Sequence, residues 1–220
     1  MPELRVDAII FDMDGVVIDS GDIYAKHWRQ WGEGHGLDYD TDIAPVHPGR
    51  PPVETIRIVA PHLDAEAESA GFNDMLDADD LDDDIAAMPG AMALLTSLPP
   101  DRWAIATSAF RVIARQWLAR AALPEPAALV TVDDIENGKP APDPFLRAAE
   151  LLGKDPRCCL VVEDAPAGIS GAKAAGATVL AVQTTHVPDD LGEADHLTAG
   201  LHTISATFDD GDGLLVSWRP

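Results

Sequence analysis

The sequence predicts an α/β protein with a parallel sheet and an inserted helical segment. From about residue 89 onward, apolar runs of strand length alternate with helix-like segments, which is the pattern of parallel strands joined by crossover helices. Residues 17–86 interrupt this alternation with helical patterns only. We therefore expect residues 1–16 and 87–220 to form the core, and residues 17–86 to form an inserted helical subdomain.

The first elements follow from the apolar pattern before residue 89. The run at 5–11 reads as one buried strand. The insertion then opens with a helix, which ends at the glycine-rich residues 32–36. The apolar face of this helix is formed by Ile23, His27, Trp28 and Trp31. A loop at 46–52 precedes a helix closed by Pro61, and residues 66–88 form an acidic, helix-prone segment.

The remaining elements make up the alternating part of the core. Strands are expected at 102–108, 127–132, 158–164 and 178–185, and helices at 89–98, 111–123, 144–153 and 167–177. The tail at 204–218 predicts a hairpin, because the residues DDGDG separate two apolar runs.

The charge balance limits the possible partners. The chain has 38 acidic and 15 basic residues, a net charge of −23, which argues against nucleic acids and anionic membranes as partners. Such a field also repels an anionic substrate unless the site binds a cation, so it favours a divalent metal. Adaptation to high salt is an alternative reason for the acidic excess.

The cysteines and the N-terminus indicate a cytoplasmic protein. Cys158 and Cys159 are adjacent in an apolar run, which excludes an intrachain disulfide framework and predicts two small buried side chains. The N-terminus lacks the shape of a signal peptide, and no apolar stretch approaches the length of a membrane span. We expect a cytoplasmic monomer.

Polar residues lie at the ends of four of the predicted core strands or in the loops that follow them. In an open parallel sheet, the carboxyl ends of the strands line one crevice where ligands bind. The residues that this pattern brings to one edge of the sheet are Asp12, Asp14, Ser108, Lys139, Glu163 and Asp164. Their common placement predicts a single site.

The residue types in this group favour phosphoryl transfer. Clustered carboxylates repel one another, and a bound Mg²⁺ relieves that repulsion with hard oxygen ligands. A lysine and a serine hydroxyl suit a phosphate, and a carboxylate can act as a nucleophile. A calcium loop starting at Asp12 fails, because its fifth and twelfth positions fall on Val16 and Ile23. A merely structural turn at DMDG stays open when that motif is taken alone.

Four motifs, in order, resemble those of the haloacid dehalogenase-like superfamily. They are DMDGVVIDS, ATSA, GKPAPDPF and VVEDAPAGISGAKAAG. The resemblance covers nearly the whole chain and implies a Rossmann-like parallel sheet sandwiched by helices, with a small helical cap at residues 17–86. Further similarity, in WRQWGEGHGL and in the run from RWAIATSA to VQTTH, points to the sugar- and polyol-phosphate phosphatases.

The resemblance also implies a role for each residue of the group. Asp12 would attack phosphorus, and Asp14 would protonate the leaving alcohol and then activate water. Ser108 and Lys139 would hold the phosphoryl oxygens. The expected Mg²⁺ ligands are Asp12, the backbone carbonyl of Asp14, and Asp164, with Glu163 binding directly or supporting the others. The implied partner is a small phosphomonoester.

Other activities on this scaffold are less well supported. A dehalogenase needs no acid for a halide leaving group, so Asp14 sets that activity aside. A β-phosphoglucomutase-like enzyme is the alternative, but such mutases carry a histidine where this chain has Tyr24, and His27 lies three residues further on. A non-catalytic binding protein usually lacks one of the site residues, and none is missing.

The cap is expected to set substrate specificity. Arg50 is the first candidate for a substrate contact, since its guanidinium suits phosphate or hydroxyl groups, and His47 is the second. Trp28 and Trp31 either wall the pocket or pack the cap against the core.

Overall fold

A six-stranded parallel sheet forms the centre of the computed structural model, which describes residues 1–48, 50–78, 85–208 and 213–220. The strands, in spatial order, are β6 (Ala128–Val130), β5 (Trp103–Ala106), β2 (Ala8–Phe11), β7 (Cys159–Glu163), β8 (Thr178–Val182) and β9 (His196–Thr198). All neighbouring pairs are parallel. The predicted strands of the core are thus confirmed, and β9 is an addition that its mixed pattern did not reveal.

Helices cover both faces of this sheet. One apolar cluster joins Ile9 and Phe11 of β2 to α4 (Ala91–Ser97) and α5 (Arg111–Arg120). The alternate residues Ala8 and Ile10 belong to a second cluster with α6 (Asp143–Leu152) and α7 (Pro166–Ala174). This alternation is what a strand buried on both faces produces. The predicted parallel sheet sandwiched by helices is therefore confirmed.

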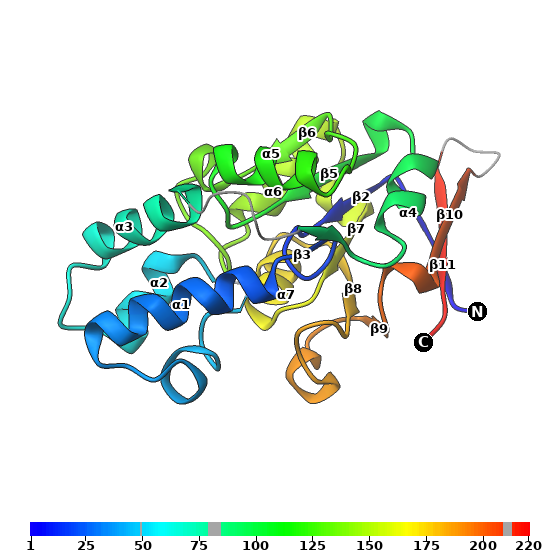
Figure 1. Cartoon of the computed structure of the whole chain (residues 1–220). Helices are drawn as coiled ribbons and strands as arrows, with labels where there is room; N and C mark the ends of the chain where they lie inside the picture. Colours follow the sequence, from blue (N-terminus) through cyan, green and yellow to red (C-terminus); the bar gives the residue numbers. More distant parts are fainter. Residues whose placement is uncertain (49, 79–84, 209–212) are drawn as a thin grey trace.

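The terminal residues build a second, antiparallel sheet. β1 (Glu3–Val6) pairs with β11 (Leu214–Trp218), which pairs with β10 (Ile204–Phe208). The predicted hairpin is confirmed, although its turn residues 209–212 lie outside the described part of the chain. Figure 1 shows this sheet at one end of the molecule, together with both termini.

The single strand predicted at 5–11 is wrong, because the chain changes sheet at Asp7. The Asp7 amide donates a hydrogen bond of 2.8 Å to the Cys158 carbonyl, which directs β2 into the parallel sheet. β1 before it belongs to the antiparallel sheet. A run of apolar residues does not by itself show which neighbour each half of a strand pairs with.

Along the chain, three longer helices follow β2 before the rest of the core, as expected. They are α1 (Gly21–His35), α2 (Pro52–Val59) and α3 (Ala65–Ala78), and Figure 1 shows them together at the end opposite the termini. Gly36 ends α1 with a φ of 71°, in the left-handed region that glycine adopts readily. The boundaries 17 and 86 of the cap stay a prediction. Residues 79–84, most of the acidic run, lie outside the described residues.

The insertion is not helical throughout, which corrects the sequence-based expectation. β3 (Ile18–Asp19) pairs antiparallel with β4 (Ala86–Ala87). Two-residue strands are too short for any periodicity to reveal them. They bring the two ends of the insertion side by side, so the chain leaves and re-enters the core through a two-stranded connection. We call this pair of strands the hinge ribbon.

Short helical turns occupy several connections. They lie at Tyr39–Ile43, Pro100–Arg102, Val132–Asp134, Pro156–Cys158, Pro188–Leu191 and Leu201–Thr203. Within the described ranges, none of the helices combines the length and the apolar character that crossing a membrane requires.

Both cysteines are free. Cys159 is buried as expected, whereas Cys158 precedes the strand and is exposed, so its predicted burial is wrong.

Candidate active site

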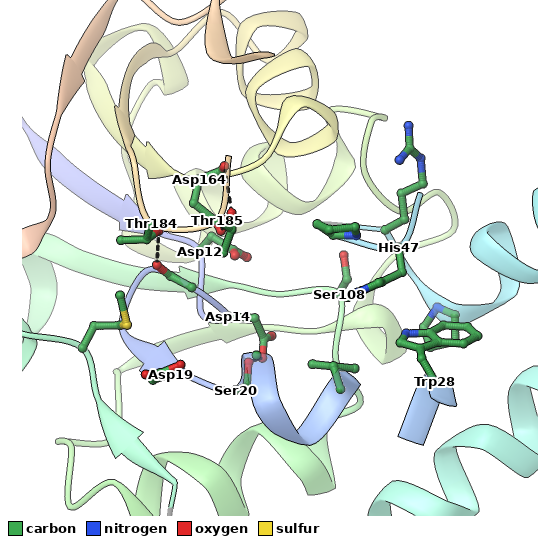
Figure 2. A pocket seen from close by; sticks show the side chains of 17 residues that line it. Asp12, Asp14, Asp19, Ser20, Trp28, His47, Ser108, Asp164, Thr184 and Thr185 are labelled. Atoms are coloured by element: carbon green, nitrogen blue, oxygen red, sulfur yellow. Dashed lines mark hydrogen bonds between the residues drawn. The ribbon is translucent and has the colours of Figure 1, made fainter. Parts of the chain in front are cut away.

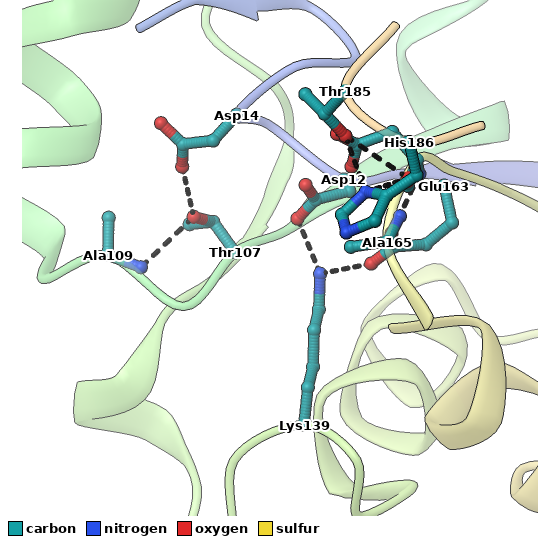
Figure 3. A network of polar contacts seen from close by, with 10 residues as sticks. Asp12, Asp14, Thr107, Ala109, Lys139, Glu163, Ala165, Thr185 and His186 are labelled. Carbon is teal, nitrogen blue, oxygen red and sulfur yellow. Dashed lines mark hydrogen bonds and ion pairs between the residues drawn. The ribbon is translucent and has the colours of Figure 1, made fainter. Parts of the chain in front are cut away.

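The central strands end in register, and this places the predicted residues together. Phe11 of β2 lies beside Ile105 of β5 and Val162 of β7. The Asp12 amide continues the ladder with a hydrogen bond of 2.9 Å to the Val162 carbonyl. Since the polar residues end these strands or follow them, they converge at one sheet edge, and Figure 3 shows this for Asp12, Asp14, Lys139 and Glu163. The predicted convergence is correct.

Lys139 reaches this edge from the loop after β6 and contacts two of the acids. Its ammonium group donates hydrogen bonds to Asp12 Oδ1 and to Glu163 Oε1, the latter at 2.6 Å. The side chain is 1% exposed. Burial alone would lower the pKa of Lys139, but the carboxylates of Asp12 and Glu163 raise it above its ordinary value. Lys139 is therefore a permanent cation at the base of the site.

Glu163 is held by protein donors at both of its oxygens. Oε1 accepts from Lys139, while Oε2 accepts from the backbone amides of Asp164 and Ala165 at 2.8 and 3.0 Å. A Cβ atom on Gly168 would lie 1.6 Å from Oε1, so the glycine makes room for this carboxylate. Of the two roles left open for Glu163, this geometry favours support of Lys139 and of the strand end.

Three buried carboxylates can hold a cation. One oxygen from each of Asp12, Glu163 and Asp164 lies within 4.8 Å of the other two. Burial raises the pKa of Asp12 from 3.8 to about 7, and burial followed by the neighbouring acids raises the pKa of Asp164 well above its ordinary value. Carboxylate oxygens in this number suit a hard divalent cation, which would offset the repulsion. The donor set therefore fits Mg²⁺.

The Asp14 side chain is not part of this group of three. Its Oδ1 accepts a hydrogen bond of 2.6 Å from the Ser20 hydroxyl, and its Oδ2 accepts one of 3.4 Å from the Thr107 hydroxyl. In Figure 3, Asp14 lies on the Thr107 side of Asp12, and Glu163 lies on the other side. Burial raises the pKa of Asp14, against the lowering effect of the Ser20 hydrogen bond. The backbone carbonyl of Asp14 as a metal ligand stays a prediction.

Two neighbouring hydroxyls follow β5. Ser108 Oγ is buried and, among the residues that the structure describes, has no hydrogen-bond partner. A buried hydroxyl without a partner costs free energy, so a ligand oxygen is the natural complement. Thr107 is a residue that the sequence-based assignment missed. It is 1% exposed, and its hydroxyl accepts from the Ala109 amide at 3.0 Å and reaches Asp14. The sequence does place Thr107 next to Ser108 at the end of the predicted strand, which is the pattern that could have identified it.

A cavity of about 290 Å³ opens over these groups. Its walls come from the core and from the insertion, as Figure 2 shows. The lining includes Asp12, Asp14, Ser108 and Asp164 from the core, and Tyr24, Trp28, His47 and Arg50 from the insertion. Lys139 lies behind Asp12, outside this lining. The proposed substrate contacts of His47 and Arg50 thus have the right location but stay predictions.

The wall that the insertion contributes to the cavity includes aromatic rings and one neutral imidazole. Trp28 is 1% exposed and lines the cavity. Its ring centroid lies 4.1 Å from that of Phe72 on α3, a contact within the insertion, so packing of Trp28 against the core stays a prediction. Burial, with a smaller contribution from His186, lowers the pKa of His47 to about 4. Arg50 donates a hydrogen bond of 2.5 Å to the Val46 carbonyl. Near neutral pH, therefore, Arg50 carries a charge in this wall and His47 does not.

Comparisons with known proteins agree with this geometry. The model of the haloacid dehalogenase-like hydrolase family matches residues 6–176. Hexitol phosphatase A of Escherichia coli (strain K12) is 36% identical over 209 residues, which cover 93% of this chain and 95% of that protein. Glycerol-1-phosphate phosphohydrolase 2 of Saccharomyces cerevisiae is 33% identical, covering 86% and 80%. The crystal structure of a hydrolase from Pseudomonas syringae superposes with a TM-score of 0.75 at 25% identity, covering 89% and 94%.

Proposed function

The chain belongs to the haloacid dehalogenase-like hydrolase family, and on that premise we propose that it is a Mg²⁺-dependent phosphatase of sugar or polyol phosphates that works through an aspartyl-phosphate intermediate. The observation that carries the proposal is the buried set of Asp12, Glu163 and Asp164, the first two in contact with the Lys139 ammonium. This set lies at the base of a cavity where the Ser108 hydroxyl has no hydrogen-bond partner in the described part of the chain. The names of the two relatives, a hexitol phosphatase and a glycerol-1-phosphate phosphohydrolase, support the reaction and the substrate class.

The metal would be held by Asp12 and Asp164, with Glu163 supporting them from the Lys139 side. When bound, Mg²⁺ neutralises charge on the phosphoryl group and allows the carboxylates to ionise together. The protein's own cation, Lys139, contacts Asp12 directly. A bound Mg²⁺ would also weaken the negative field at the site. With a net charge of −23, the protein otherwise repels a phosphate monoester.

In the first step, an Asp12 carboxylate oxygen attacks phosphorus. The bond between phosphorus and the ester oxygen breaks, and Asp14 donates its proton to the departing alcohol. Asp14 is suited to this because burial raises its pKa and so favours the protonated form. Ser108 would hold a phosphoryl oxygen, and Lys139, which contacts Asp12 from behind, would reach a second one beside that residue. The products of this step are the free alcohol and a phosphorylated Asp12.

In the second step, Asp14, now a carboxylate, removes a proton from water. The water oxygen attacks phosphorus, the bond to Asp12 breaks, and inorganic phosphate leaves. Asp12 is regenerated as a carboxylate and Asp14 as an acid, so atoms and protons balance over the cycle.

The cavity wall fits a substrate with an uncharged, hydroxylated end. His47 is neutral near pH 7 and can exchange hydrogen bonds with hydroxyl groups. The Trp28 ring offers an apolar face for the C–H groups of a sugar or polyol. Arg50 can donate to hydroxyl oxygens through its planar fork. These contacts are part of the proposal.

Residues of α1, the helix after the first motif, favour the phosphatase over the mutase alternative. Tyr24, at the position where such mutases carry histidine, lines the cavity. His27 faces the interior of the insertion, where its Nδ1 lies 2.8 Å from the Ile23 carbonyl and its ring packs against Phe72. His27 is 2% exposed, so it cannot take the place of the missing histidine.

Phosphate release from a substrate panel tests the proposal. The panel contains hexitol, glycerol and aldose phosphates and one nucleoside monophosphate, each with Mg²⁺ and with a chelator. We expect Mg²⁺-dependent release that is fastest with polyol or sugar phosphates, and none from Asp12→Asn. Interconversion of sugar phosphate isomers without phosphate release would favour the mutase. No metal-dependent turnover of any phosphomonoester would overturn the proposal.

A further inference from the structure

The residues after β8 make direct contact with one of the proposed metal ligands. Thr185 Oγ1 donates a hydrogen bond to Asp164 Oδ2 and also lies 3.2 Å from the Asp164 carbonyl oxygen. His186 Nδ1 lies 3.0 Å from the same carbonyl. The neighbouring Thr184 hydroxyl donates a hydrogen bond of 2.6 Å to the Gly15 carbonyl. This segment therefore connects the first and the fourth motifs, and Figures 2 and 3 show its contacts.

Gly15 closes the other side of the Asp164 carboxylate. A Cβ atom at Gly15 would lie 2.3 Å from Asp164 Oδ2 and 2.7 Å from Thr185 Cγ2. Gly15 also has a φ of 76°, in the left-handed region where a side chain is strained. Asp164 Oδ2 is thus enclosed between the Gly15 backbone and the Thr185 side chain, and its position is defined by both.

We propose that Thr185 is a positioning residue that holds Asp164 in the orientation needed to bind the cation. Asp164 Oδ2 accepts the hydrogen bond from Thr185 and lies against the Gly15 backbone, so the other carboxylate oxygen, Oδ1, remains for the metal. Without this hydrogen bond, repulsion from Asp12 and Glu163 would favour rotation of Asp164 away from the group. The inference rests on the proposed function, since it concerns the metal site of that reaction.

The expected effect is on Mg²⁺ affinity. Hydrogen-bond partners that orient a metal-binding carboxylate contribute about 10- to 100-fold in affinity. Thr185 is exposed, so its hydroxyl can be removed without opening a cavity in the core. Thr207 on β10 is also exposed, and the antiparallel sheet that holds it lies at the opposite end of the molecule from the insertion, which makes it a matched control.

Calorimetric titration of the metal-free protein with Mg²⁺ tests the inference without any substrate. Thr185→Val should bind about 10- to 100-fold more weakly than wild type, whereas Thr185→Ser, which keeps the hydroxyl, and the control Thr207→Val should bind nearly normally. Thr185→Ala provides a second variant without the hydroxyl should valine disturb folding. Melting temperatures in chelator report whether each variant is folded.

The outcomes separate this inference from the proposed function. Wild-type affinity in Thr185→Val and Thr185→Ala, or an equal loss in Thr185→Ser, would overturn the positioning role and leave the phosphatase untouched. If wild type itself bound no Mg²⁺, both the inference and the metal dependence of the proposed reaction would fall. A loss confined to the two variants without the hydroxyl would establish Thr185 in its role.

Discussion

Ser20 donates a hydrogen bond of 2.6 Å to Asp14 Oδ1. Ser20 is 2% exposed and lies between the hinge ribbon and α1, where the chain leaves the core. Asp14 belongs to the loop that follows the central strand β2. The proposed proton carrier is therefore tied to the base of the helical insertion rather than to the acids beside it. Burial raises the pKa of Asp14, and the Ser20 hydroxyl opposes this by stabilising the carboxylate.

Replacing Ser20 should shift the pH dependence of catalysis. In Ser20→Ala the carboxylate loses a donor, so the pKa of Asp14 rises, and the protonated acid persists to higher pH. The alkaline limb of the kcat/KM profile should move upward by about one pH unit, the effect of one hydrogen bond to a charged group. Ser205→Ala on β10 is the control. An unchanged limb, or one displaced to lower pH, would count against Asp14 as the acid.

Replacing Asp14 itself should affect substrates according to their leaving groups. Asp14→Asn cannot protonate the departing oxygen, which matters most when the alkoxide is strongly basic. We expect a loss of about 10²–10⁴ in kcat with alkyl phosphates and a much smaller loss with aryl phosphates. Steady-state rates on glycerol phosphate and p-nitrophenyl phosphate give the comparison. Equal losses on both substrates would contradict the proton-donor role.

Ser108 offers a test in which stability and function move separately. Its Oγ is buried and has no hydrogen-bond partner among the residues placed in the structure, so Ser108→Ala removes an unsatisfied group and should change the free energy of unfolding by less than about 1 kcal/mol. The same change should weaken inhibition by inorganic phosphate and lower kcat/KM, each by roughly 10-fold, the value of one hydrogen bond to a charged oxygen. Thr107→Val, which breaks the contact with the Ala109 amide, should instead lower stability. A Ser108 variant with normal phosphate affinity would refute the assignment.

The raised pKa of Asp12 predicts how stability depends on pH and metal. Its value is about 7 in the metal-free fold and 3.8 in the unfolded reference, so the fold binds the extra proton between these values. The metal-free protein therefore loses stability as pH rises from about 4 to about 7. A cation competes with that proton, so Mg²⁺ should raise the melting temperature more near pH 8 than near pH 5. Thermal melts with Mg²⁺ and with chelator measure this, and a larger effect at acid pH would contradict it.

The sequence predicted the convergence of Asp12, Ser108, Glu163 and Asp164 because that depends on a local rule. Each ends a strand or follows one closely, and parallel strands end at one sheet edge. The contacts of Thr107 and Thr185 with the acids could not be predicted in this way. Thr107 and Asp14 are separated by 93 residues, and Thr185 and Asp164 by 21, so their contacts depend on loop conformations that no periodicity encodes.

Errors in the predicted fold have the same physical origin. The residues 5–11 have the composition of one strand, but the sheet that each half joins depends on partners far along the chain. β1 pairs with β11 near the C-terminus, whereas β2 pairs with β5 and β7. The hinge ribbon is held by pairing between Ile18 and Ala87, two residues far apart in the chain. By contrast, α1 was predictable because its apolar face repeats at helical spacing and ends at glycine.

The most direct measurement is the location of a covalent phosphoenzyme. Wild-type enzyme turning over a ³²P-labelled polyol phosphate with Mg²⁺ is quenched in acid, digested and mapped by mass spectrometry, with Asp12→Asn as the control. We predict label on the peptide that contains Asp12, at the Asp12 carboxylate, released by hydroxylamine as an acyl phosphate is, and absent from the variant. Label on a hydroxyl such as Ser108, or turnover by Asp12→Asn near the wild-type rate, would contradict Asp12 as the nucleophile.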